Sequence, residues 1–239
     1  MPYTDRLMES LSNVMNQEQI GIEPDRTNEI VFDKVSFKYP SSEQVIINSF
    51  NLTIKKGEKV AITGKSGSGK TTLLKLITGM LIPTSGTISF SGIDLREIDI
   101  VSMHKRIGYV MQENILFNTT IRENLLYGKS NASEEELVTA CKKAYIYEFI
   151  QSTPGGFDTI IGEKGIKLSG GQRQRIVLAR MFLQDIDIFI FDEATSALDQ
   201  YSESIVHDAI KSIAEDKTII IVAHRESSIK LCNRVIKLE

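Results

Sequence analysis

The chain has 239 residues, of which 41% are hydrophobic and 25% are charged, so it can form one large globular domain or two small ones. Its formal net charge is −3 and it has no long basic run, which gives little support to a nucleic-acid partner. The longest apolar stretches have strand length, far below the roughly 20 residues of a membrane span, and no signal-peptide pattern is visible.

Residues 1–27 differ from the rest of the chain. Apolar residues recur at helical spacing within the first fifteen positions, and polar residues follow at 16–19 and 23–26. This pattern predicts a short amphipathic helix and a linker. A frayed terminus is the alternative, and composition alone favours it.

The next part of the chain, residues 28–92, is rich in strand signals. Stretches of β-forming residues at 30–37, 45–54, 59–63 and 87–90 are separated by turn residues at 39–42, 56–58 and 83–86. We expect an antiparallel layer beside the strand at 59–63, with 87–92 forming a hairpin-like edge.

A complete phosphate-binding pattern follows the strand at 59–63. Nine residues match G-x-x-x-x-G-K-[ST] at every fixed position, namely Gly64, Lys65, Ser66, Gly67, Ser68, Gly69, Lys70, Thr71 and Thr72. Glycines let the backbone wrap an anion with its N–H groups pointing inward, and the helix expected after the loop adds its positive end. Lys70 is expected to reach the outer phosphates and the Thr71 hydroxyl to hold Mg²⁺. A Gly/Ser linker is the alternative, but the flanking strand and helix favour a nucleotide site.

After a strand at 107–111, which ends at Gln112, the pattern becomes helical. One helix is expected at 121–127, and a capping box at Ser133 opens a longer one to about residue 151. A glycine-rich connector then leads to a pentapeptide made of Leu168, Ser169, Gly170, Gly171 and Gln172. Ser169 and Gln172 occupy capping-box positions, so a hydroxyl, two glycines and a helix N-terminus predict a second anion site.

The last third alternates strand and helix, which predicts a parallel sheet covered on both faces. A strand at 186–191 ends at Asp192 and Glu193, Ser202 is expected to cap a helix, and a strand at 218–223 ends at His224. Asp192 suits the Mg²⁺ shell through water, and Glu193 is placed to polarise a water that attacks a γ-phosphate. A general base of this kind contributes about 10²–10⁴ in rate. An ordinary acidic loop is the alternative.

Several reactive side chains lie outside these motifs. Cys141 and Cys232 are far apart in helix-like patterns and fit reduced core thiols better than a disulfide or a metal site. This favours the cytosol or the cytosolic face of a membrane. His104 and His207 match no motif and are interpreted as surface or helix residues.

The order of the motifs in this chain resembles that in ATP-binding cassette (ABC) proteins. The motifs are the phosphate loop, residues 168–172, the strand with Asp192 and Glu193, residues 196–199 and His224. The resemblance is to the nucleotide-binding domain of an ABC transporter. It covers residues 28–239, and residues 168–172 match the family's most specific signature without a change. It implies an α/β fold, with a P-loop NTPase core and mostly parallel sheet, an antiparallel β layer and a helical subdomain at about 113–170.

The resemblance also implies roles for single residues. Tyr39 would stack on adenine, although the residues alone suggest an ordinary strand-end tyrosine. Gln112 would touch Mg²⁺ and the attacking water. His224 would contact the γ-phosphate and orient Glu193, although a lone histidine after a buried strand usually caps or packs. Asp199 would couple two sites across a dimer.

Residues 120–125 and 162–165 resemble segments of exporter-type domains that face a membrane domain. Residues 1–27 resemble the join to a preceding membrane-spanning half, and residues 185–187 lack a proline that is common in the family. The chain stops soon after His224, where relatives continue for another short strand and helix. We therefore expect an excised domain, soluble alone, whose full-length chain carries the membrane domain and works at the cytoplasmic face.

The function implied by the resemblance is Mg²⁺-dependent ATP hydrolysis that drives export. Two copies would sandwich two ATP molecules head to tail, each γ-phosphate lying between the phosphate loop of one copy and Ser169 and Gly171 of the other. The alternatives are the ATPase subunit of an importer and a non-transport ABC ATPase acting on nucleic acid. The latter would need a basic groove, a coiled-coil insertion or a second cassette, and the sequence shows none, so no nucleic-acid partner is expected.

Overall fold

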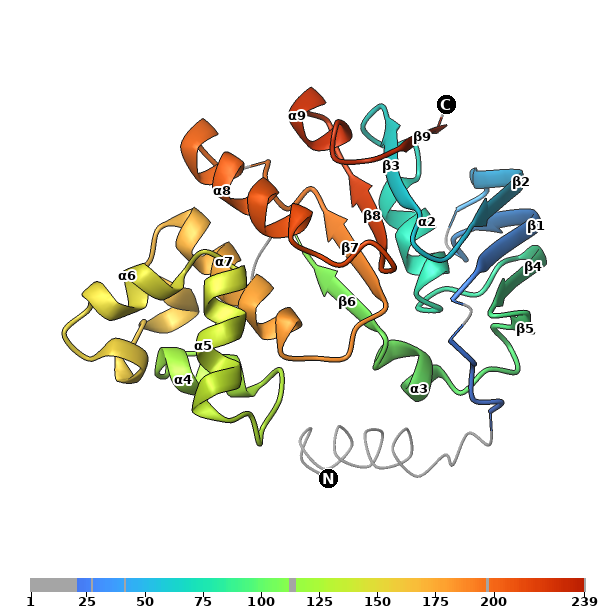
Figure 1. Ribbon diagram of the computed structural model, residues 1–239. Coiled ribbons are helices and arrows are strands. Elements are labelled where there is room, and N and C mark those ends of the chain that lie inside the picture. Colours follow the sequence, from blue (N-terminus) through green and yellow to red (C-terminus); the bar gives the residue numbers. More distant parts are fainter. Residues whose placement is uncertain (1–20, 27, 41, 112–114, 197, 239) are drawn as a thin grey trace, which may run out of the picture.

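The computed structural model describes residues 21–26, 28–40, 42–111, 115–196 and 198–238, and these form two sheets with helices around them (Figure 1). The antiparallel sheet has the strand order β2-β1-β4-β5, with β1 (Ile30–Lys38), β2 (Val45–Ile54), β4 (Ser85–Phe90) and β5 (Ile93–Asp94). The parallel sheet has the order β6-β7-β8-β3-β9, with β3 (Lys59–Gly64), β6 (Ile107–Val110), β7 (Ile188–Asp192), β8 (Thr218–Val222) and β9 (Arg234–Leu238).

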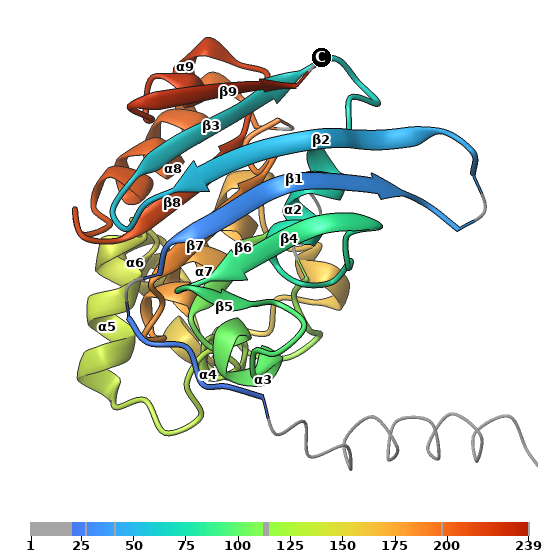
Figure 2. The ribbon, with the colours of Figure 1, turned by 90° about the vertical axis from the view of Figure 1, so that its right-hand side faces the viewer.

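The helices divide between the two faces of the parallel sheet. The described helices are α2 (Lys70–Ile77), α3 (Ile100–His104), α4 (Ile121–Leu126), α5 (Glu134–Lys143), α6 (Tyr147–Ser152), α7 (Gly170–Phe182), α8 (Gln200–Lys211) and α9 (Glu226–Ile229). Short 3₁₀ turns lie at Gly156–Asp158 and Glu163–Gly165. Helix α2 lies between the parallel and antiparallel sheets, whereas α7 and α8 cover the opposite face (Figures 1 and 2).

Strand β8 is buried on both faces, as its continuous apolar sequence predicts. Successive side chains of a strand point to opposite faces. Ile219 and Ile221 belong to the core shared with α7 and α8, whereas Ile220 and Val222 belong to the core shared with α2. All five residues of β8 are buried, so an alternating pattern would have left one face without a core.

Helices α4, α5 and α6 lie together beyond α7, at the far side from the antiparallel sheet (Figure 1). The capping box predicted at Ser133 is confirmed, and Thr120 forms a further one at the start of α4. The single helix expected from 133 to about 151 is wrong, because Tyr145 has a φ of 55° and this left-handed conformation separates α5 from α6.

One further expectation, the cap of α8, needs correction. The cap of α8 is Asp199, whose side chain accepts a hydrogen bond from the Ser202 amide, so Ser202 lies in the first turn. The interpretation of His104 and His207 as surface or helix residues is confirmed, since His104 is exposed at the end of α3 and His207 lies on α8, where it is buried at 7% relative exposure. The strand β9, which the sequence did not predict, pairs in parallel with β3 from Val60↔Arg234 to Gly64↔Leu238.

The cysteines, the helix lengths and the N-terminal segment were also the subject of predictions. Cys141 and Cys232 are free thiols in the structure, and burial raises the pKa of each to about 12. Within the described ranges no helix has the length and apolar character needed to cross a bilayer. The helix expected near the N-terminus lies outside the described residues.

Replacing Ser133 with alanine tests the cap of α5. The Ser133 hydroxyl accepts a hydrogen bond from the Glu136 amide at 3.2 Å, and its loss leaves that donor unsatisfied. We expect the free energy of unfolding to fall by about 1 kcal/mol in urea denaturation. Ser130→Ala, at an exposed turn position, is the control and should leave the urea midpoint unchanged. Equal midpoints for Ser133→Ala and the parent would show that the cap does not stabilise α5.

Candidate functional site

The N-terminus of α2 has no capping side chain. Its N-cap residue is Gly69, in a left-handed conformation with φ 90°, and no side-chain cap hydrogen bond is present among the described residues. The first-turn amides, those of Lys70, Thr71 and Thr72, have no acceptor within the helix. Without a side-chain cap, this helix end can offer its amides to an anion.

Lys70 and Ser68 bring further donors to the same loop. The Lys70 ammonium donates to the carbonyl oxygens of Gly64 and Lys65, at 3.0 and 2.9 Å, which leaves one of its three donors. The Ser68 hydroxyl is buried and has no hydrogen-bond partner in the described part of the chain. A buried polar group without a partner costs about 1–3 kcal/mol, so the loop fits an anion that would satisfy it.

Glycine is required where the loop begins. A Cβ on Gly64 would lie 2.5 Å from the Ser68 hydroxyl oxygen and 2.6 Å from the Leu238 carbonyl oxygen. At Gly67 a Cβ would meet nothing within 4 Å. The loop is therefore closed against β9 at Gly64 and open to solvent at Gly67.

The loop and Glu193 line one cavity of about 230 Å³. Glu193 reaches it from the end of β7, and the loop from the end of β3. Ile46 also lines the cavity, and the loop residues on its wall are Ser66, Gly67, Gly69, Lys70, Thr71 and Thr72. The structure thus brings together the two strand ends that the sequence singled out, at the carboxyl edge where α/β sheets bind ligands.

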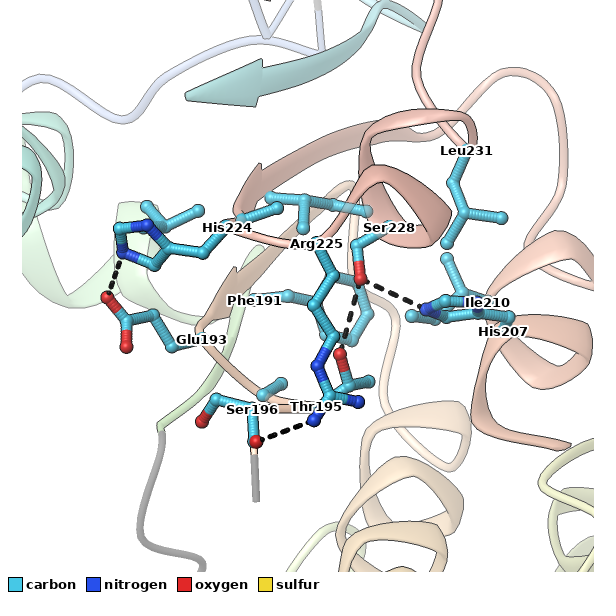
Figure 3. Close-up of a pocket in the computed structure, with 14 residues that line it drawn as sticks. Phe191, Glu193, Thr195, Ser196, His207, Ile210, His224, Arg225, Ser228 and Leu231 are labelled. Carbon is cyan, nitrogen blue, oxygen red and sulfur yellow. Dashed lines mark hydrogen bonds and ion pairs between the residues drawn. The ribbon is translucent and has the colours of Figure 1, made fainter. Parts of the chain in front are cut away.

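Glu193 is paired with His224 across the ends of β7 and β8. The Glu193 Oε1 lies 2.9 Å from the His224 Nε2 (Figure 3). Glu193 has a φ of 50°, and its amide donates to the Val222 carbonyl at 3.2 Å, which fixes this left-handed backbone. The pair is partly exposed, with 28% of the Glu193 side chain and 48% of the His224 side chain accessible.

Asp192 is held by a residue that the sequence did not reveal. The Tyr109 hydroxyl donates to the Asp192 Oδ2 at 2.9 Å. Burial raises the pKa of Asp192, and the hydrogen bond from Tyr109 opposes that rise. Burial and the neighbouring carboxylate also raise the pKa of Tyr109, so its hydroxyl stays protonated and remains a donor.

Tyr39 lies beside the loop. Its hydroxyl is 3.2 Å from the Thr72 hydroxyl, and its ring meets the edge of Phe37 with centroids 5.0 Å apart. The side chain is half-buried, so part of it remains accessible. This position leaves Tyr39 next to the phosphate loop.

Residues 168–172 form the predicted cap but do not join this cavity. The Ser169 hydroxyl accepts from the Gln172 amide at 3.2 Å, and Gln172 Oε1 accepts from the Ser169 amide at 2.8 Å. Gly171 packs closely against α8, because a Cβ added to Gly171 would lie 2.8 Å from the Ser202 Cβ. Helix α7 covers the sheet face opposite α2 (Figure 1), and no residue of 168–172 lines the cavity described above.

Two further predicted residues have different outcomes. Asp199 is exposed, and hydrogen bonds from Ser202 lower its pKa while it caps α8. Gln112 lies outside the described residues.

The residues present suit a magnesium ion that is held mainly by its substrate. Thr71 is exposed at the start of α2 and offers a hydroxyl, and Asp192 offers a carboxylate oxygen beyond the one that Tyr109 contacts. No group of three metal-binding side chains occurs in the described ranges. Mg²⁺ is usually bound through one or two protein oxygens, substrate phosphates and water, so this donor set fits it.

Comparison with known proteins gives a consistent result. Residues 47–196 match the family model described as ABC transporter. Two multidrug export ATP-binding/permease proteins of Staphylococcus aureus are similar to this chain. The one from strain NCTC 8325 is 44% identical over 229 residues, or 96% of this chain and 39% of the relative. The one from bovine strain RF122 is 45% identical over 205 residues, which are 86% of this chain and 36% of the relative.

A solved structure of a bacterial Atm1-family ABC exporter with ATP bound is similar to this chain, with a TM-score of 0.83 and 33% sequence identity. The match covers 97% of this chain and 42% of the exporter chain. The ABC ATPase fold predicted from the sequence is confirmed by this match. The chain spans about two fifths of the length of the relatives it matches.

Tyr109→Phe tests how Asp192 is held. Without the donor, burial acts alone on the carboxylate, so the pKa of Asp192 should rise further. The carboxyl ¹³C resonance of Asp192, followed by NMR through a pH titration, should then titrate at higher pH than in the parent. Tyr201→Phe, at an exposed position on α8, should leave the titration in place. An unchanged or lower midpoint in Tyr109→Phe would contradict this assignment.

Proposed function

The chain is an ATPase domain of the ABC transporter family, and on that premise we propose that it drives export through a membrane domain by closing on ATP with a second copy. One observation carries the chemistry: the phosphate loop and Glu193 line the same cavity, and Glu193 is paired with His224. The names of the relatives, which are ATP-binding/permease proteins, support export and a membrane partner.

The phosphate loop binds the triphosphate of ATP. The open amides of α2 and the unpartnered Ser68 hydroxyl offer donors, and Lys70 exchanges its contacts with Gly64 and Lys65 for phosphate oxygens. Tyr39, beside Thr72, stacks on the adenine, which is worth about 1–3 kcal/mol. Thr71, Gln112 and Asp192, the last through water, would hold Mg²⁺, which would neutralise phosphate charge when bound.

Glu193 accepts a proton from the attacking water. Glu193 lines the same cavity as the loop, and His224 holds its carboxylate through the contact with Oε1. This arrangement supports Glu193 as the general base and His224 as the residue that orients it. The family resemblance adds a contact of His224 with the γ-phosphate and of Gln112 with the water.

A second copy supplies the other side of the site. Residues 168–172 present a capped helix N-terminus, with Ser169 exposed, yet they do not reach the phosphate loop of their own chain. In a two-fold dimer each copy can offer this end to the phosphate loop of the other. Ser169 and Gly171 then contact the γ-phosphate in trans, and Asp199 couples the two sites. Hydrolysis removes the phosphate that bridges the copies.

The membrane domain contacts the helical region. Ile115, Phe117 and Tyr127 are exposed, and the rings of Phe117 and Tyr127 stack with centroids 4.2 Å apart. The Arg180 guanidinium lies 5.9 Å from both rings. An exposed apolar cluster of this kind, close in sequence to Gln112, supports a docking surface for a membrane domain of the same full-length chain. The domain then works at the cytoplasmic face of a membrane.

Glu193→Gln tests the assigned base. The amide keeps the shape of the carboxylate but cannot take a proton, so ATP turnover should fall about 100-fold or more. ATP binding should persist, and an ATP-dependent dimer should accumulate, as measured by size-exclusion chromatography with light scattering. Glu215→Gln, at an exposed position, is the control and should hydrolyse ATP like the parent. Turnover at the parental level in Glu193→Gln would exclude Glu193 as the base.

A further inference from the structure

A buried carboxylate outside the nucleotide cavity lies at the start of α8. Only 8% of the Glu203 side chain is exposed. The Ser227 hydroxyl donates to its Oε1 at 2.6 Å, the Arg225 guanidinium contacts its Oε2, and the His207 Nε2 lies 3.5 Å from its Oε1. Burial opposes the charge of Glu203, but the hydrogen bonds from Ser227 and Arg225 outweigh it and hold its pKa below the usual range.

Arg225 connects Glu203 to the segment that follows Glu193. One guanidinium nitrogen donates to the Leu198 carbonyl at 3.2 Å and also contacts Glu203. The other terminal nitrogen donates to the Ser196 carbonyl at 3.0 Å (Figure 3). Arg225 follows His224 directly in the chain, so one side chain links the end of β8, the segment after β7 and the first turn of α8.

The buried side chains of Leu198 and Ala223 join these segments to the core, but the packing beside them is incomplete. A cavity of about 200 Å³ lies beneath them, with walls that include Phe191, Ile210 and Leu231 (Figure 3). On one wall the Ser228 hydroxyl contacts the Thr195 hydroxyl at 3.2 Å and the His207 Nε2 at 3.1 Å. Side chains leave this space open, so polar contacts add to the apolar packing of Leu198 and Ala223 in holding the segments, and Arg225 makes three of these contacts.

We propose that Arg225 is a positioning residue, which fixes His224 relative to Ser196 and Leu198 and so holds Glu193 ready for catalysis. The inference rests on the proposed function, because it assigns Arg225 to the same reaction. Arginine suits the task, since its planar fork reaches several acceptors at once, whereas lysine presents a single point charge.

Arg225→Lys in the 239-residue chain tests the proposal while keeping the positive charge. The kcat for ATP should fall about 10–100-fold, because a small misplacement of catalytic groups has an effect of this size. The affinity for a fluorescent ATP analogue, measured by equilibrium binding, should stay within about twofold, because the phosphate loop is untouched. Amide hydrogen exchange should become faster at Ser196 and Leu198, whose amides donate to Glu193 and Thr195.

Arg26→Lys is the matched control, because Arg26 forms an exposed ion pair with Asp185 and takes no part in the nucleotide site. Its kcat should equal that of the parent. A kcat for Arg225→Lys within about twofold of the parent, or a parallel loss of kcat and affinity, would overturn the proposal.

Glu203→Gln decides the question if Arg225→Lys does not fold. It keeps an acceptor oxygen but removes the charge that holds the guanidinium, so kcat should again fall with affinity preserved, and an unchanged kcat would overturn the proposal. Glu193→Gln separates this inference from the function on which it rests. If Glu193→Gln hydrolyses ATP at the parental rate, the assigned base is refuted. If Glu193→Gln loses turnover while Arg225→Lys keeps it, only the positioning role of Arg225 is refuted.

Discussion

The open N-terminus of α2 is the constraint on which the rest of the site depends. A helix end carries unsatisfied amides and a positive potential, and the chain provides no side chain to cap it at Gly69. Lys70 instead folds onto the loop's own carbonyls, and the Ser68 hydroxyl is left without a partner in the described part of the chain. The loop is thus built for a multiply charged anion that satisfies several donors at once.

The parallel sheet brings the chemistry to that anion. Strands β3, β7 and β8 are neighbours, or nearly so, in the order β6-β7-β8-β3-β9, so their carboxyl ends present the loop, Asp192, Glu193 and His224 at one edge. Helix α7 lies on the opposite face, and its capped N-terminus is therefore free of the cavity. In the proposed dimer, each site would combine the phosphate loop of one copy with the capped end of α7 from the other.

The sequence was a good guide wherever the information was local. The phosphate loop, the capping box at Ser169 and the fully apolar strand β8 each carry their own signal, and the structure agrees with each of them. Contacts between distant segments carry no such signal. Tyr109 reaches Asp192 only because β6 pairs with β7, and knowledge of the strand order would have been needed to foresee it.

Other errors have equally physical causes. The cap of α8 was misplaced because Asp199 and Ser202 are both good capping residues, and only the backbone conformation decides between them. The edge strand β9 is five residues long with three exposed positions, so its pattern is weak, and its pairing with β3 creates it. His207 and Glu203 are buried polar residues on a helix, a placement that periodicity does not reveal.

The central claim is that a competent site needs the phosphate loop of one copy and residues 168–172 of another, and a mixing experiment tests it most directly. Lys70→Ala damages the first half and Ser169→Arg the second, so each variant alone should be inactive. In an equal mixture about half of the dimers pair the two variants, and each mixed dimer has one site with both lesions and one intact site. The account predicts that ATP hydrolysis recovers to about a quarter of the parental rate. A mixture as inactive as its components would contradict it.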